Sequence, residues 1–134
     1  MAKYQAAVLD LPMTACGDLN SYQYFFVRCA STNGRIQVAN GASGPMPLGV
    51  LQNDPRDLEE ATVRVWGTSK VKFCTESAVG YGDWVVSGSA GTAEEHSGSI
   101  AATGIAMEDV VAGASTYAEV LLFPVSTNVT DNTA

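Results

Sequence analysis

Hydrophobic and polar residues alternate with a period of two along much of this chain, and that pattern predicts β-strands. The segment "SKVKFCT" shows it clearly, because Lys70 and Lys72 alternate with Val71 and Phe73. One face of such a strand is exposed and the other is buried. Together with β-branched and aromatic content, the pattern predicts strands at 21–30, 35–39, 48–52, 61–67, 69–75, 83–88, 99–107 and 117–123. Helical periodicity is limited to a possible single turn in "NDPRDLEEA", so the predicted fold class is all-β.

The chain contains an internal repeat. The segment "LGVLQND" (48–54) aligns with "TGIAMED" (103–109) when Gly49 is placed on Gly104. Each block is followed by a loop and then by a strand centred on Val63 or Val120. A single unit of this size leaves an apolar face and two strand edges uncovered, whereas two units can cover each other. We therefore predict a small closed or nearly closed β-barrel built from two pseudo-repeated β units, about 21–75 and 78–123.

The two ends of the chain differ from this barrel domain, which we place at 21–124. Residues 1–20 are predicted to form an extended N-terminal arm with apolar side chains at Tyr4, Val8, Leu9 and Leu11. Such an arm adds a strand either to its own barrel or to a neighbouring protein, and both outcomes stay open. Residues 125–134 are polar and are predicted to form a flexible C-terminal tail.

Composition and charge exclude several classes of partner. Hydrophobic residues make up 46% of the chain and charged residues 16%, as expected of a folded domain. The net charge of −7 argues against nucleic acid as a partner, and no apolar run is long enough to span a membrane. All seven basic residues precede residue 73, so the charge is +1 (7 − 6) before that position and −8 (0 − 8) from it onward. The acidic part either orients the protein on a partner or only aids solubility.

The residues that could carry chemistry do not form a recognisable site. The one histidine, His96, lies in the Gly/Ser/Glu-rich segment 91–99, which reads as a solvated loop without the rigid frame that a catalytic triad needs. Three cysteines, Cys16, Cys29 and Cys74, lack the short spacing of a zinc site and are predicted to be reduced, because no export signal is recognisable. We therefore expect no enzyme activity, no catalytic residues, no metal and no cofactor.

Trp66 and Trp84 each lie beside a glycine at one end of a predicted strand. An indole at such a position either caps the core or stands at an interface, and capping is favoured because two isolated tryptophans do not form a patch. If they instead line a groove together with Tyr81, a carbohydrate-binding module becomes the alternative function.

The segments already quoted also resemble a known family. "LGVLQNDPRDLEEATVRVWGTSKVKF" (48–73), "AVGYGDWVVSGSAG" (78–91) and "ATGIAMED" with "AEVLLF" (102–109 and 118–123) are similar to the small capsid decoration, or cement, proteins of tailed phages, formerly filed as a domain of unknown function. The resemblance runs from about residue 24 to 123. It rests on glycines and strand patterns, which identify a fold more directly than an activity.

The resemblance implies a structural virion protein that is made in the host cytoplasm and located on the outer surface of a phage head. It implies the major capsid protein as partner, a homotrimer as the oligomer, and stabilisation of contacts between capsid subunits as the function. Capsid or subunit contacts are then expected at Tyr4, Val8, Leu9, Leu11, Trp66 and Trp84. The alternative is a β-sandwich carbohydrate- or receptor-binding module exposed on a virion.

Overall fold

The structure, a computed structural model, describes residues 7–41, 46–74, 78–96, 102–113 and 116–123. These residues form β-strands and no α-helix, as the sequence predicts. The strands are β1 (Leu9–Ala15), β2 (Phe26–Cys29), β3 (Arg35–Val38), β4 (Pro47–Leu51), β5 (Glu60–Lys72), β6 (Trp84–Ser87), β7 (Ala93–Glu95), β8 (Gly104–Ala106) and β9 (Tyr117–Leu122).

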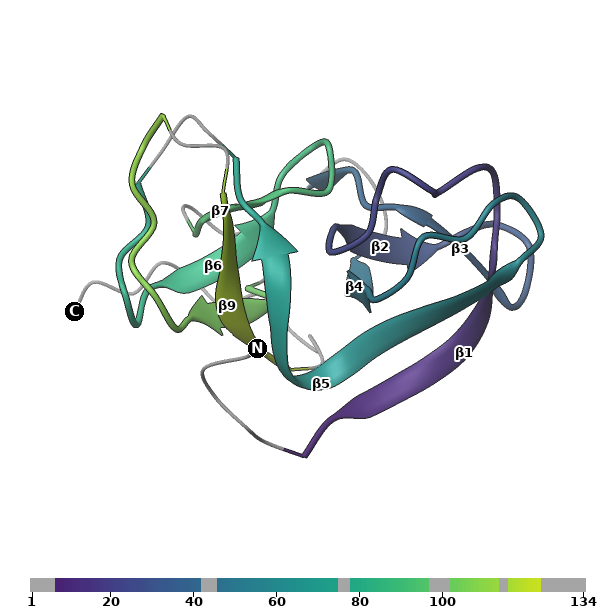
Figure 1. Cartoon of the computed structure of the whole chain (residues 1–134), viewed down its shortest axis with the longest axis horizontal. Helices are drawn as coiled ribbons and strands as arrows, with labels where there is room; N and C mark the ends of the chain where they lie inside the picture. The colour runs from purple at the N-terminus through teal and green to yellow at the C-terminus, as the bar shows by residue number, and fades with distance from the viewer. Residues whose placement is uncertain (1–6, 42–45, 75–77, 97–101, 114–115, 124–134) are drawn as a thin grey trace.

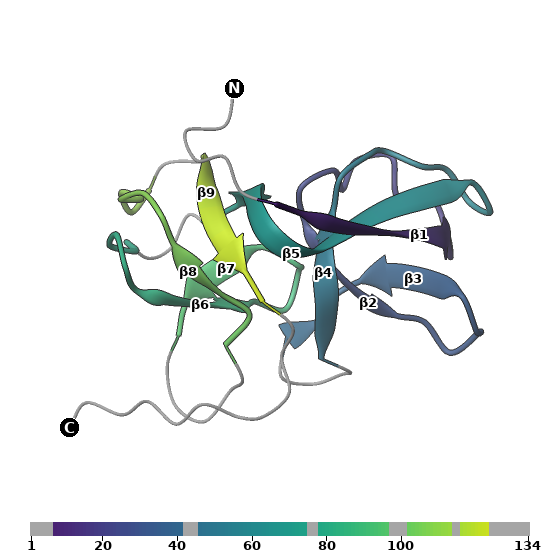
Figure 2. The ribbon, with the colours of Figure 1, turned by 90° about the horizontal axis from the view of Figure 1, so that it is seen from below.

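The first ring consists of β1, β3, β2, β4 and the N-terminal half of β5, hydrogen-bonded in that order. It closes because β1 pairs antiparallel with β5, placing Leu11 opposite Val63, and parallel with β3, placing Ala15 opposite Ile36. Figures 1 and 2 show this ring at one end of the molecule, with the long β5 running from it to the other end. Closure leaves no free strand edge within the ring.

The second ring uses the C-terminal half of β5, followed by β9, β8, β6 and β7. Just beyond the end of β5, Phe73 forms a parallel bridge with Ala93 of β7, which brings the last strand back to the first. This bridge corresponds to the parallel pairing of β1 with β3. The expectation of an all-β closed barrel is therefore confirmed. The two units do not complete one barrel between them, because each closes into its own ring around its own core and the two rings share β5. Figure 2 shows β5 running through both rings.

Strand register shows that the repeat is structural. In the first ring Val50 lies opposite Arg64. In the second ring Ile105 lies opposite Leu121, so the alignment of Gly49 with Gly104 predicted from the sequence holds residue by residue. A side chain at either glycine would overlap the neighbouring strand. A Cβ at Gly104 would lie 2.6 Å from the carbonyl oxygen of Leu121, and one at Gly49 would meet the carbonyl of Arg64.

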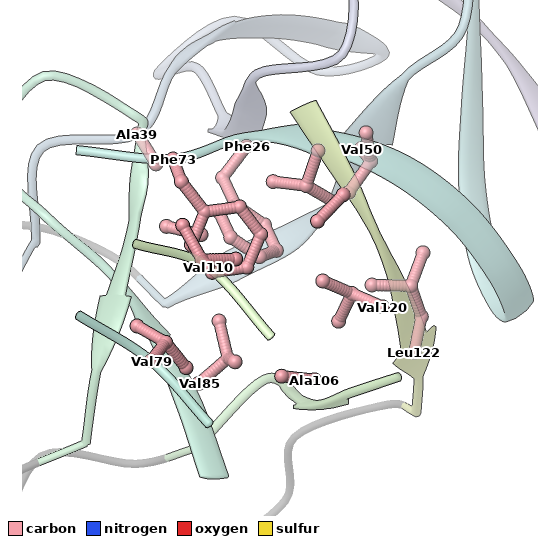
Figure 3. Close-up of a cluster of buried hydrophobic side chains, with 13 residues drawn as sticks. Phe26, Ala39, Val50, Phe73, Val79, Val85, Ala106, Val110, Val120 and Leu122 are labelled. Atoms are coloured by element: carbon pink, nitrogen blue, oxygen red, sulfur yellow. The ribbon is translucent and has the colours of Figure 1, made fainter. Parts of the chain in front are cut away.

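Two hydrophobic cores follow from the two rings. The core of the first ring contains Ala15, Leu19, Val27, Ile36, Leu51, Ala61, Val63 and Val65. The core of the second contains Val71, Phe73, Val79, Val85, Ala93, Ala106, Val110, Ala118, Val120 and Leu122, and Phe26, Ala39 and Val50 of the first repeat pack against it. Figure 3 shows the rings of Phe26 and Phe73 side by side in this cluster. Since Phe26 and Val50 alternate with residues of the first core, they project outward from the first ring and are buried by the second.

Several segments differ from the sequence-based expectation. Residues 9–15, placed in an arm outside the barrel, form β1 of the first ring, so the barrel begins at Leu9 rather than at residue 21. Of the two outcomes left open for these residues, the chain adds the strand to its own barrel. The strands expected at 61–67 and 69–75 are one continuous strand, β5. Gly67 lies within this strand with a φ of 100°, and the strand continues through it.

The segment around His96 also differs from the expected solvated loop. Residues 93–95 form β7, and His96 is buried with its backbone N–H donating to the carbonyl of Trp84. The strand expected to begin at residue 21 begins only at Phe26, since Tyr24 adopts a left-handed φ of 71°. No helical turn forms at residues 53–61, where Leu58 has a φ of 68°.

Candidate functional site

The residues expected to contact a partner do not form one surface in the structure. Leu9 of β1 lies directly opposite Trp66 of β5, and these side chains are 53% and 51% exposed. Val8 precedes Leu9, is 45% exposed and lies against the backbone of Gly67. We call Val8, Leu9 and Trp66 the apolar edge. It is exposed surface on the strand pair that closes the first ring, so it presents a bulky indole on a rigid frame.

The other predicted contact residues behave differently. Leu11 is partly buried against the core of the first ring and acts there as a packing residue. Tyr4 lies outside the described residues. Trp84 is 44% exposed and contacts Phe123 edge to face, with ring centroids 5.8 Å apart. Trp66 and Trp84 are each about half exposed, and neither belongs to the clusters of buried residues.

The repeat explains why Trp84 is exposed. In the first ring Phe26 pairs with Val50, and in the second ring Trp84 pairs with Ile105 at the corresponding positions. Phe26 is fully buried because the second ring covers it, whereas Trp84 contacts Phe123 and is still 44% exposed. An exposed Trp at this position is therefore surface available to a partner.

A polar groove lies at the junction of the two rings, and sequence reasoning did not predict it. It consists of two adjoining pockets of about 270 and 410 Å³ that share Tyr24 and Lys70. The first is also lined by Gln52, Arg64, Thr68, Ser69 and Glu119, and the second by Asn20, Ser21, Gln23 and Tyr117. Strands from both repeats supply these residues, which lie far apart in the sequence, so no local motif announces the groove.

Charged groups in the junction groove are unevenly paired. Arg64 donates from Nε to Asp10 Oδ1 at 2.9 Å, from Nη2 to Asp10 Oδ2 at 3.2 Å and from Nη1 to the carbonyl of Thr68 at 3.1 Å. Glu119 is 4% exposed, and its Oε2 has no hydrogen-bond partner within the described structure. Burial raises the pKa of the Glu119 carboxyl, the Glu108 carboxylate raises it further, and Lys70 and Arg64 oppose the shift.

The raised pKa predicts a pH dependence of stability. A folded-state pKa above the ordinary value of 4.5 means that protonated Glu119 contributes stability fully below that value. This contribution is lost as the pH rises through the folded-state pKa. Glu119→Gln, which stays neutral, should therefore have a higher thermal midpoint than the unchanged protein at pH 7, and the gap should vanish near pH 4. Melting curves from pH 4 to pH 8 measure this.

Glu108→Gln is the matched variant for this prediction. Removing the Glu108 charge lowers the pKa of Glu119, so it should recover part of the gain at pH 7. The loss of the hydrogen bond from the Glu119 backbone N–H to Glu108 Oε2, 2.9 Å long, is small because an amide oxygen replaces the acceptor. A pH-independent effect of Glu119→Gln would contradict the assignment.

Among the described residues, no group of three His, Cys, Asp or Glu side chains is arranged to hold a metal ion. The three cysteines are free. The part of the chain that the structure covers has no helix long and apolar enough to cross a membrane.

Comparison with known proteins finds similarity in structure and none in sequence families. No family model matches this chain, and no curated protein matches its sequence. The resemblance to capsid decoration proteins therefore stays a prediction. Among solved structures, the chain is similar to the N base of head fiber gp8.5 of bacteriophage phi29, with a TM-score of 0.64 and 16% sequence identity. The match covers 87% of this chain and 94% of that one, so the two share the fold over most of their length.

Proposed function

We propose that this protein is a structural component of a tailed-phage virion that binds the outer surface of the head and stabilises contacts between major capsid subunits. The observation that carries the proposal is the shared fold with the N base of a phage head fiber over 87% of the chain. The segments that resemble capsid decoration proteins support the same conclusion from a separate source, because they were identified from the sequence alone.

The physical properties of the fold suit this role. Two closed rings that share one strand form a rigid body with few free edges, which resists unfolding and unwanted strand pairing. A protein that binds the assembled shell and not its separated subunits stabilises the shell by mass action. A homotrimer would present three copies of each contact, so that weak contacts combine into firm attachment through avidity.

The apolar edge is the surface we assign to shell binding. Leu9 and Trp66 face each other across the strand pair that closes the first ring, so β1 and β5 hold both side chains in place. Trp is the residue most often found at the energetic centre of an interface. Because both side chains are about half exposed, they are available without any rearrangement of the barrel.

Co-sedimentation tests this function and the surface together. The purified full chain should sediment with expanded heads of the phage that encodes it and not with their precursor shells. Trp66→Ala should weaken binding to expanded heads by at least about thirtyfold, corresponding to the roughly 2 kcal/mol that defines an interface hot spot. Its thermal midpoint should change little, since the side chain is not part of either core.

Val111→Ala is the control for this measurement. Val111 is an apolar side chain that is 71% exposed and lies in the loop between β8 and β9, next to Val110, which bridges to Val79 in the second repeat. Its replacement should leave sedimentation unchanged. Equal binding by all three proteins would remove the apolar edge from the contact, and failure of the unchanged chain to bind any head would overturn the proposed function.

A further inference from the structure

The junction groove has the size of a small-molecule site and a mainly polar lining. Its two pockets, about 270 and 410 Å³, adjoin through Tyr24 and Lys70 and together fall within the range of about 300–1,000 Å³ typical of ligand pockets. Two tyrosine rings stand in it edge to face, with the centroids of Tyr24 and Tyr117 5.9 Å apart. The rest of the lining is formed by amide, hydroxyl and charged side chains. Aromatic rings among many hydrogen-bonding groups favour a ligand that has both apolar faces and polar edges.

A buried acceptor without a partner and an exposed ammonium group face the groove. Glu119 is almost fully buried, lines the groove, and has an Oε2 that accepts no hydrogen bond in the described structure. Lys70 lies directly opposite Glu119 on the neighbouring strand, yet the described residues form no ion pair with it. Its Nζ lies over the ring of Tyr24, 5.9 Å from the centroid. An unsatisfied buried polar atom is costly, so the Oε2 of Glu119 requires an explanation beyond packing.

The backbone at Tyr24 provides an independent observation. Tyr24 has a φ of 71°, a left-handed conformation that is unfavourable for a bulky side chain. Its backbone N–H donates to the carbonyl of Leu51 at 2.7 Å. In the second repeat Gly82, with a φ of 89°, donates in the same way to Ala106 at 2.8 Å. A glycine meets the backbone requirement in one repeat, whereas the other keeps a strained tyrosine whose ring lines both pockets, which is the kind of strain that accumulates at functional sites.

We infer that the junction groove binds a saccharide unit, with neighbouring hydroxyl groups hydrogen-bonded to Lys70 and Glu119 and the sugar ring packed against Tyr24 and Tyr117. A hydroxyl group both donates and accepts, so a pair of them satisfies the ammonium donor of Lys70 and the carboxyl acceptor of Glu119 together. Gln52 orients the wall of the site, since its Nε2 donates to Ser69 Oγ at 2.9 Å and to the carbonyl of Val50 at 3.1 Å.

A simple anion or cation fits the groove less well. An anion would have Lys70 as its partner but would lie beside the carboxyl group of Glu119. The guanidinium of Arg64 is already engaged by Asp10 and by the carbonyl of Thr68, so it offers an anion little further bonding. A cation would satisfy Glu119 but would be repelled by the ammonium of Lys70. Neutral hydroxyl groups avoid both penalties.

The test is a titration of the full, isotope-labelled chain with glucose, galactose, N-acetylglucosamine and their disaccharides, followed by amide chemical shifts. At least one of these sugars should shift the amides of Gln52, Ser69 and Lys70 in a saturable way. Tyr24→Gly should weaken this binding at least tenfold while the thermal midpoint holds or rises, because glycine removes the backbone strain along with the ring. Tyr24→Asn, which tolerates a left-handed φ, is the second variant in case glycine loosens the turn.

Two controls separate this site from the other surfaces. Trp84→Ala should leave sugar affinity unchanged, and Tyr24→Gly should still co-sediment with phage heads, so that loss of sugar binding and loss of shell binding are distinguishable. The inference is overturned if none of the sugars binds. It is equally overturned if the shifts centre on Trp66 or Trp84, or if only a free amino acid, whose amine and carboxylate could span Glu119 and Lys70, occupies the groove.

Discussion

Replacing Gly49 with alanine should open the first ring. A Cβ at this position of β4 would overlap the carbonyl oxygen of Arg64 on β5 and lie 2.9 Å from its carbonyl carbon. Both contacts are to backbone, so no side-chain rotation relieves them, and β4 must separate from β5. We expect a loss of more than about 3 kcal/mol, beyond the usual cost of overpacking. Thermal denaturation should show a midpoint lower by roughly 10 °C or more.

Gly113→Ala is the matched control for this change. Gly113 has a φ of 87°, but a Cβ there meets no atom within 4 Å, so the substitution costs only the backbone strain of about 1–2 kcal/mol. Gly104→Ala should resemble Gly49→Ala, because its Cβ would lie 2.6 Å from the carbonyl oxygen of Leu121 in the second ring. If Gly49→Ala and Gly113→Ala melted alike, the close approach of β4 to β5 would be incorrect.

Deleting residues 1–20 should unfold the first ring rather than remove a dispensable arm. The deletion takes away β1, which pairs with β5 over the register from Leu9 to Thr14 and with β3 at Thr14 and Ala15. It also removes Leu19, a residue of the first core. Truncating a core leucine to alanine alone costs about 2–5 kcal/mol of stability. The unpaired edges of β3 and β5 would then be exposed to aggregation.

Deletion of residues 1–6 is the control, since every strand pairing of β1 begins at Leu9 or later. In size-exclusion chromatography and melting curves, the shorter deletion should behave like the full chain. The longer deletion should aggregate. A well-folded protein lacking residues 1–20 would show that β1 is not required to close the ring. The comparison also matters for shell binding, because the apolar edge contains Leu9 and is lost only in the longer deletion.

Local pattern was sufficient for many of the strands. The alternation of Lys70 and Lys72 with Val71 and Phe73 is present at the C-terminal end of β5 and in the residue that follows it, and the two apolar side chains are fully buried. The Asn33-Gly34 turn connects the antiparallel pair β2 and β3, as a hairpin signal predicts. These features depend on neighbours in the chain, so their signal lies within a few residues.

Other elements lacked such a signal. Residues 93–95 carry two glutamates in a Gly/Ser-rich segment, and they become β7 only because β6 offers a partner strand. Residues 9–15 contain Pro12 and few β-branched residues, yet they form β1 because β5 and β3 lie on either side. In both segments, pairing with a distant strand overrides weak local preference.

The candidate sites divide in the same way. Leu9 and Trp66 were named from the sequence as contact residues, but only the register of β1 with β5 places one opposite the other. The junction groove had no sequence signal, because Tyr24, Lys70 and Glu119 come together only when β9 pairs with β5 beside the first ring. The polar neighbours of His96 predict a solvated side chain. In the structure His96 directly follows β7 and is buried.

The amino-acid pattern alone predicted the all-β class, the presence of two equivalent units, and the equivalence of Gly49 and Gly104. Those properties follow from side-chain alternation and backbone sterics, which act over a few residues. The folded structure was needed to show that each unit closes around its own core, that β5 belongs to both rings, and that Phe26 is covered while Trp84 is half exposed. The reason is that two nearly equivalent units must meet along one strand, and the face that each presents to the other is set by packing between residues far apart in the chain.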